Sequence, residues 1–146
     1  MTMACRGLQG KAMWWFSRKK PKEAWEETIQ WPIGDIEAAE RIRHVCRSAA
    51  DSAASVGHPA DGADRRKKRD AKKNLDDGER YKGAARTAME IAMKMSDDLM
   101  RDAGVGEIIE LCLKANDIKT ARILFRAIRS PSIRDGMLSD HPALRP

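Results

Sequence analysis

The stretch KANDIKTARILFRAIRSPSIRDGML, residues 114–138, decides the fold because its pattern occurs twice in the chain. The dipeptide TA stands at residues 87–88 and again at 120–121, and RD stands at 101–102 and again at 134–135. At this spacing of 33 residues, apolar positions fall on apolar positions, and the turn-forming SDD falls within one residue of SPS. A fixed spacing in the low thirties is typical of stacked helical hairpins, because a single hairpin cannot bury its apolar face alone.

The same stretch predicts where one helix ends and the next begins. Asn116 and Asp117 are expected to form a tight turn, and the Asp117 carboxylate is expected to cap the following helix. In that helix Ala121 leaves room for a neighbouring backbone. Phe125, one turn later, is expected to fill the space beside Ala121 in the core.

These residues resemble the stretch around the inter-helix turn of a tetratricopeptide repeat. Residues 116–117 match the turn, Ala121 the small residue, Phe125 the aromatic residue and Pro131 the proline that closes the unit. The large aromatic residue and the glycine that are usual in the first helix of that family are absent. Over residues 81–138 the resemblance implies a non-catalytic protein-binding scaffold with a concave groove.

The composition favours helices over strands. Of the 146 residues, 42% are hydrophobic and 34% are charged, but only 5% are aromatic. Alanine, methionine and the charged residues dominate, and most of these are good helix formers. We therefore predict an all-α fold, a short stack of antiparallel helical hairpins of the α-solenoid or tetratricopeptide-like type, with a basic linker inserted in it.

Shifts in composition divide the chain into five segments. Asp35 is expected to cap the second segment, and Gly57 to end it. The segments are an aromatic and basic N-terminal segment with a short helix (1–33), an amphipathic helix (34–57), a charged linker (58–80), the helical-hairpin region (81–140) and a short tail (141–146).

Cysteine use and hydropathy predict a cytoplasmic location. Cys5, Cys46 and Cys112 are isolated and odd in number, which suits a reducing compartment better than a disulfide framework. No apolar run approaches the ~20 residues that span a bilayer. The N-terminus lacks the continuous apolar core expected of a signal peptide, and Met13 is a candidate for an alternative start.

Positive charge is concentrated in one segment. Its seven basic residues and the single Asp70 give a net charge of +6, equal to that of the whole chain. Such a run can contact nucleic-acid phosphates without sequence specificity, but it contains no aromatic residue for base stacking. The prediction is a solvated loop first and a nucleic-acid site second, at Arg65, Arg66, Lys67, Lys68, Arg69, Lys72 and Lys73.

Two groups of residues are candidates for binding a partner. Trp14, Trp15 and Phe16 precede a cluster of cations, a composition found both in tails that cover an apolar face and in contacts with a membrane surface. Packing on protein is the preferred reading, because the apolar run is so short. Met89 and Met93 fall off the main apolar stripe of their helix and could form an adaptable binding surface.

Catalytic and metal-binding patterns do not occur in the sequence. His44, His58 and His141 are far apart, and no third metal ligand joins them at a usable spacing. Cys46 and Cys112 lie on apolar helix faces, which indicates core residues rather than nucleophiles. We expect no enzyme activity, no cofactor, no metal and no small-molecule substrate.

The leading hypothesis is a protein-binding adaptor that takes a peptide or helix of another protein, or of a second copy of itself, in a groove between hairpins. The first alternative is a nucleic-acid-associated regulator that uses the basic run. The second alternative is a membrane-peripheral adaptor anchored by residues 14–16.

Overall fold

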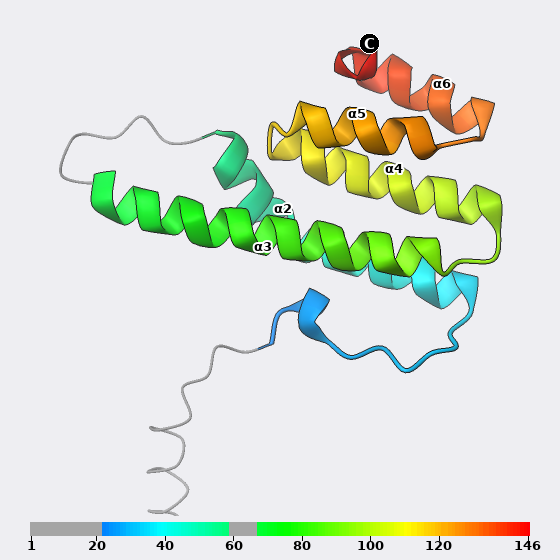
Figure 1. Ribbon diagram of the computed structural model, residues 1–146, viewed down its shortest axis with the longest axis horizontal. Helices are drawn as coiled ribbons and strands as arrows, with labels where there is room; N and C mark the ends of the chain where they lie inside the picture. Colours follow the sequence, from blue (N-terminus) through cyan, green and yellow to red (C-terminus); the bar gives the residue numbers. More distant parts are fainter. Residues whose placement is uncertain (1–21, 59–66) are drawn as a thin grey trace, which may run out of the picture.

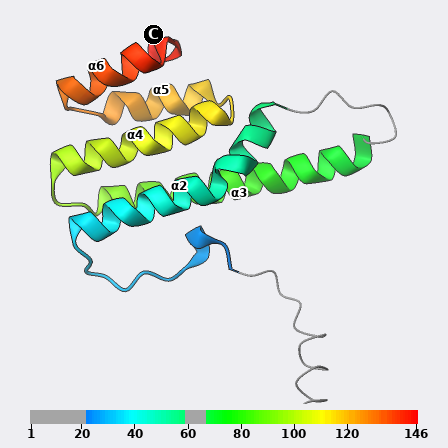
Figure 2. The same cartoon turned by 180° about the vertical axis from the view of Figure 1, so that it is seen from behind.

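The computed structural model describes residues 22–58 and 67–146, and this part of the chain is all-helical, as predicted. Successive α-helices run back and forth, and α2 packs against both α3 and α4 (Figures 1 and 2). In chain order the elements are η1 (Ala24–Glu26), α2 (Asp35–Gly57), α3 (Lys67–Met93), α4 (Asp98–Lys114), α5 (Ile118–Ala127), α6 (Pro131–Asp140) and η3 (Pro142–Leu144).

The face of α2 that packs against α3 and α4 carries several small side chains. The inward face of α2 carries Ala38, Ala49 and Ala53, and all three are buried. Alanines at helical spacing let two helix backbones approach closely, so larger residues such as Ile42 and Ile91 fill the remaining space. The apolar spacing of residues 34–57 therefore predicted this helix and its buried face correctly.

Helix α4 lies at the centre of the fold and contacts α2, α3, α5 and α6. It is apolar on more than one side, with Ile108, Ile109 and Leu111 all buried. A helix surrounded by others needs such a distribution, whereas a surface helix has one apolar stripe. Helix α4 lies close to α2 at Gly104, where an added Cβ atom would be 3.0 Å from Cδ1 of Ile42 on α2.

The turn between α4 and α5 forms as predicted. Asn116 adopts φ 57°, a left-handed conformation that asparagine tolerates better than most residues. The amide of Asp117 donates to the Cys112 carbonyl at 2.9 Å, which closes the end of α4. The Asp117 carboxylate accepts from the Thr120 amide at 3.2 Å and so caps α5.

Phe125 is buried, with 5% of its surface exposed, which confirms its predicted place in the core. The chain after α6 folds back, so that η3 contacts α5 as well as α6. Leu144 is buried there, and Arg122 Nε donates to the Ala143 carbonyl at 3.0 Å. The last residues, expected to be a tail, therefore cover the end of α5.

Two turns between helices are held by aspartates from elsewhere in the fold. Between α3 and α4, the amides of Ser96 and Asp97 donate to the carboxylate of Asp35 at 2.9 and 2.8 Å. Between α5 and α6, the amides of Arg129 and Ser130 donate to Oδ2 of Asp102 at 3.1 and 2.8 Å. Asp35 was expected to cap its own helix. Instead it is the first residue of α2, with Gly34 in the cap position, and its carboxylate holds a distant turn.

Helix α3 begins at Lys67, inside the segment predicted as a charged linker over 58–80. Asp77 and Tyr81 are buried one turn apart, while Leu75 is 70% exposed. The inward face of this part of the helix therefore carries little large apolar surface, and sequence periodicity does not detect it. Helix formation also extends readily from the apolar half of α3, because adding a residue to an existing helix is easier than starting one.

Residues 22–34 form a strap along α3, and the short helix expected in the N-terminal segment is reduced to one turn. Only Ala24–Glu26 is helical, as a single 3-10 turn. Trp25, Ile29 and Trp31 are partly buried against the core and anchor the strap.

None of the helices in the described ranges has the length and apolar character needed to cross a bilayer.

Candidate functional site

A groove of about 460 Å³ opens where α3, α4 and the end of α5 meet. Its volume lies within the range of about 300–1,000 Å³ that is usual for binding pockets. We call it the methionine–arginine groove. It is lined by Met89 and Met93 of α3, by Asp98, Arg101, Asp102 and Val105 of α4, and by Arg126, Ala127 and Arg129 from the end of α5 and the turn after it.

The apolar part of this groove is formed by Met89 and Met93. They are four residues apart on α3 and therefore lie on the same side of the helix. Met89 is partly buried, whereas 68% of the Met93 surface is exposed. The structure thus brings the two methionines selected from the sequence to one hollow, with Val105 behind them.

The two acidic residues of the groove are engaged with their own protein. Asp98 forms an ion pair with Arg101 one turn along α4. Asp102 is 3% exposed, and its carboxylate accepts the two amides of the turn between α5 and α6. Both carboxylates of the groove therefore have partners within the protein.

The guanidinium groups of Arg126 and Arg129 differ from that of Arg101. Within residues 22–58 and 67–146, neither forms a hydrogen bond or an ion pair. The carbonyls at the end of α5 are bonded by another arginine. Arg134 Nη1 donates to the carbonyls of Ile128 and Phe125 at 2.9 and 3.4 Å. The groove therefore has an apolar floor on one side and two cations without a partner in the described chain on the other.

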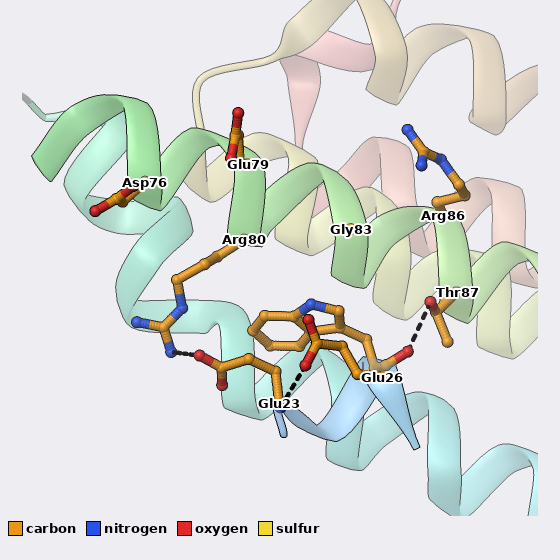
Figure 3. A pocket seen from close by; sticks show the side chains of 9 residues that line it. Glu23, Glu26, Asp76, Glu79, Arg80, Gly83, Arg86 and Thr87 are labelled. Atoms are coloured by element: carbon orange, nitrogen blue, oxygen red, sulfur yellow. Dashed lines mark hydrogen bonds and ion pairs between the residues drawn. The ribbon is translucent and has the colours of Figure 1, made fainter. Parts of the chain in front are cut away.

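A second hollow, of about 470 Å³, lies where the strap meets α3. Arg80 pairs with Glu23 at 3.0 Å, and Thr87 Oγ1 donates to the Trp25 carbonyl at 3.1 Å (Figure 3). The Trp25 indole reaches the α3 backbone because residue 83 is glycine, and a Cβ atom there would lie 3.1 Å from Nε1. Figure 3 also shows Glu79 pointing away from Glu23. These contacts attach the strap and leave no converging set of reactive groups.

Strap and helix are joined by two cation–π contacts. The Arg80 guanidinium lies 5.7 Å from the centre of the Trp25 ring, and Lys94 Nζ lies 4.5 Å from the centre of the Trp31 ring. Such contacts contribute about 0.5–1 kcal/mol each at exposed sites. In the described part of the fold, Trp25 and Trp31 therefore cover part of α3. The sequence had suggested residues 14–16 for covering an apolar face, and these lie outside the described residues.

Several of the residues selected from the sequence lie outside the described structure. Trp14, Trp15 and Phe16 do, as do Arg65 and Arg66. Of the remaining basic run, Lys67, Lys68 and Arg69 belong to the start of α3, and Lys72 and Lys73 are exposed on it. Lys72 and Lys73 are not among the residues that line the methionine–arginine groove.

The buried cysteines are poor nucleophiles. Burial raises the pKa of Cys46 to about 12, with the negative charge of Glu107 as a further cause. Burial likewise raises the pKa of Cys112. A thiol must ionise to attack, so burial disfavours a nucleophilic role for both side chains. His141 lies 3.7 Å from Glu110, and no group of three potential metal ligands occurs in the described ranges.

Sequence reasoning found the methionines of the groove but missed its arginines. Arg126 and Arg129 looked like ordinary charged positions on the solvated side of α5, because nothing in their spacing shows that α3 lies opposite. The one available signal was the number of arginines near the end of this helix, which exceeds the number needed to bond its last carbonyls.

Comparison of the chain with protein families, with curated proteins and with solved structures gives no match.

Proposed function

We propose that this chain is a non-catalytic interaction module, an adaptor that binds a peptide or helix of another protein in the methionine–arginine groove. The observation that supports this most directly is the position of Met89 and Met93, one turn apart in a hollow between α3 and α5. Methionine is unbranched and polarisable, so it adapts to partners of different shape. In this proposal the helices form the tetratricopeptide-like stack that the sequence repeat suggests.

The energetics favour a partner over solvent at this position. Burying a methionine side chain fully contributes about 1.5–3 kcal/mol relative to leaving it in water. Met93 is 68% exposed, so most of that contribution is available to a partner. An amphipathic helix uses side chains three or four residues apart to occupy such a groove, which matches the spacing of the two methionines.

A displayed library of random peptides, selected on the immobilised full chain, tests the proposal. The affinity of each enriched peptide is then measured by fluorescence anisotropy for the wild type and for Met89→Ser/Met93→Ser. We expect the double variant to bind about tenfold or more weakly, because one fully buried methionine contact corresponds to at least that factor.

The matched control is Leu75→Ser. Leu75 lies on the same helix, is 70% exposed and is not part of the groove, so its replacement should leave peptide affinity unchanged. Circular dichroism checks that all variants keep their helices. If the enriched peptides bind Met89→Ser/Met93→Ser as tightly as they bind the wild type, the groove is not the binding site.

A further inference from the structure

Positive charges outnumber negative charges in the lining of the methionine–arginine groove. Asp98 and Arg101 neutralise each other, and Asp102 is bonded to backbone amides beneath the turn. The lining as a whole carries three arginines against two carboxylates, and of these arginines only Arg126 and Arg129 have guanidinium groups without an ion pair within the described ranges. A neutral peptide would therefore offer these two guanidinium groups no carboxylate to pair with.

These arginines are released from the usual task of arginines at a helix end. Side chains of this kind often bond the last carbonyls of a helix. In α5 that task belongs to Arg134, whose guanidinium also lies 4.6 Å from the centre of the Phe125 ring. Asp102 in turn fixes the backbone at Arg129, so this guanidinium extends from a held turn. Binding a ligand therefore requires less ordering of the backbone.

The combination of guanidinium groups and a methionine floor selects one partner chemistry. A carboxylate matches a guanidinium in shape and can accept two parallel hydrogen bonds from it. A long apolar side chain next to that carboxylate would lie on Met89 and Met93. Nucleic acid fits less well, because the groove offers no aromatic ring for base stacking.

We infer that the groove recognises an acidic amphipathic segment of a protein partner, in which an aspartate or glutamate side chain next to a large apolar residue binds Arg126 and Arg129. This inference rests on the proposed function, since it names the partner of the same groove. It assigns affinity to the methionines and selection among partners to the arginines.

The test uses peptides enriched on the wild-type chain. Their C-termini are amidated, so that side chains supply the only carboxylates that can bind the arginines. We expect them to carry glutamate or aspartate beside leucine, methionine or phenylalanine. Replacing that acid by its amide should weaken binding about tenfold, because the charge-assisted hydrogen bonds to the guanidinium groups are lost. The double variant Arg126→Gln/Arg129→Gln should bind the acidic peptides about tenfold more weakly, the same loss as the acid-to-amide change causes. It should bind the amide peptides almost as well as the wild type does.

The control Arg43→Gln/Arg145→Gln removes the same charge from exposed positions outside the groove and should change nothing. If enriched peptides need the methionines but not the acid or the arginines, the inference is wrong and the proposed function stands. If they need neither methionine, the proposed function fails as well. Single-stranded DNA that binds through Arg126 and Arg129 and displaces the peptides in low salt only would also overturn a protein partner.

Discussion

Tyr81 of α3 donates a hydrogen bond of 2.9 Å to Oδ2 of Asp117, the residue that caps α5. The other oxygen of the same carboxylate accepts the Thr120 amide. One side chain therefore ends a turn and fastens that turn to a helix 36 residues earlier in the chain. Because burial also raises the pKa of Tyr81 far above its ordinary value, its hydroxyl stays a donor at every physiological pH.

Replacing Tyr81 with phenylalanine should destabilise the protein by about 1.5 kcal/mol, because a buried hydrogen bond to a charged group is lost while the ring keeps its packing. Urea unfolding followed by circular dichroism measures this. A double-mutant cycle with Tyr81→Phe and Asp117→Asn separates the energy of the Tyr81–Asp117 hydrogen bond from the other effects of each substitution. If Tyr81→Phe costs as much in the Asp117→Asn background as in the wild type, the two residues are not coupled.

Stability should fall in acid partly through Asp117. Partial burial opposes its ionisation, but hydrogen bonds from Thr120 and Tyr81 outweigh this and hold its pKa below the ordinary 3.8. A carboxylate with a lowered folded-state pKa contributes stability that is complete well above 3.8 and is lost as the pH falls through the folded value. The free energy of unfolding between pH 5 and pH 3 should therefore drop less for Asp117→Asn than for the wild type. Equal drops would contradict this.

Asp102 and Asp35 hold equivalent turns but should differ in importance. Asp102→Ala leaves two amides at a partly buried turn without an acceptor, which costs about 2–4 kcal/mol. Asp35 is more exposed, so water can replace its carboxylate and Asp35→Ala should cost less. Thermal melting of the two variants gives the order. A larger loss for Asp35→Ala would show that the turn between α3 and α4 matters more.

Phe125→Ala should cost about 3–5 kcal/mol, the usual range for removing a buried aromatic ring. The ring is 5% exposed and carries the Arg134 guanidinium over its face, so the loss includes a cation–π contact. Ile123→Ala, on the same helix but exposed, is the control and should change the midpoint of thermal unfolding very little. A Phe125→Ala protein that melts like the control would place the ring outside the core.

Features with a local cause could be predicted from the sequence, and features created by contacts between distant segments could not. Asn116 and Asp117 suit a turn and a cap in any context, so that turn was predicted correctly. The apolar spacing of Phe125 likewise predicted its burial. Asp35 also looked like a cap, but its carboxylate bonds a turn about 60 residues away, and no local pattern records such a contact.

The candidate site divides along the same line. Met89 and Met93 could be selected because they leave the apolar stripe of their own helix, which is a local property. Arg126 and Arg129 became candidates only because the fold brings the end of α5 to the same hollow as α3, with α4 contacting both helices. The start of α3 was missed for a related reason, since its inward residues there include an aspartate, Asp77, where periodicity looks for apolar side chains.

Two glycines on neighbouring helices should respond to alanine in opposite directions. At Gly57, the last residue of α2, an added Cβ atom would overlap the carbonyl oxygen of Lys114 and lie 3.1 Å from the carbonyl carbon of Ala115. Both are backbone atoms next to the turn that Asp117 fixes, so they cannot move aside, and Gly57→Ala should lower stability by about 1–3 kcal/mol. At Gly78, within α3, nothing lies within 4 Å of the new atom.

Gly78→Ala should therefore stabilise the protein by about 0.5–1 kcal/mol, the difference in helix propensity between the two residues. Urea unfolding of both variants under one set of conditions measures the contrast, and helix propensity alone would predict that both gain stability. A stabilised Gly57→Ala protein would mean that the end of α2 does not press on the end of α4. A Gly78→Ala protein with no gain would mean that α3 is not helical at residue 78 in solution, which would restore part of the predicted linker.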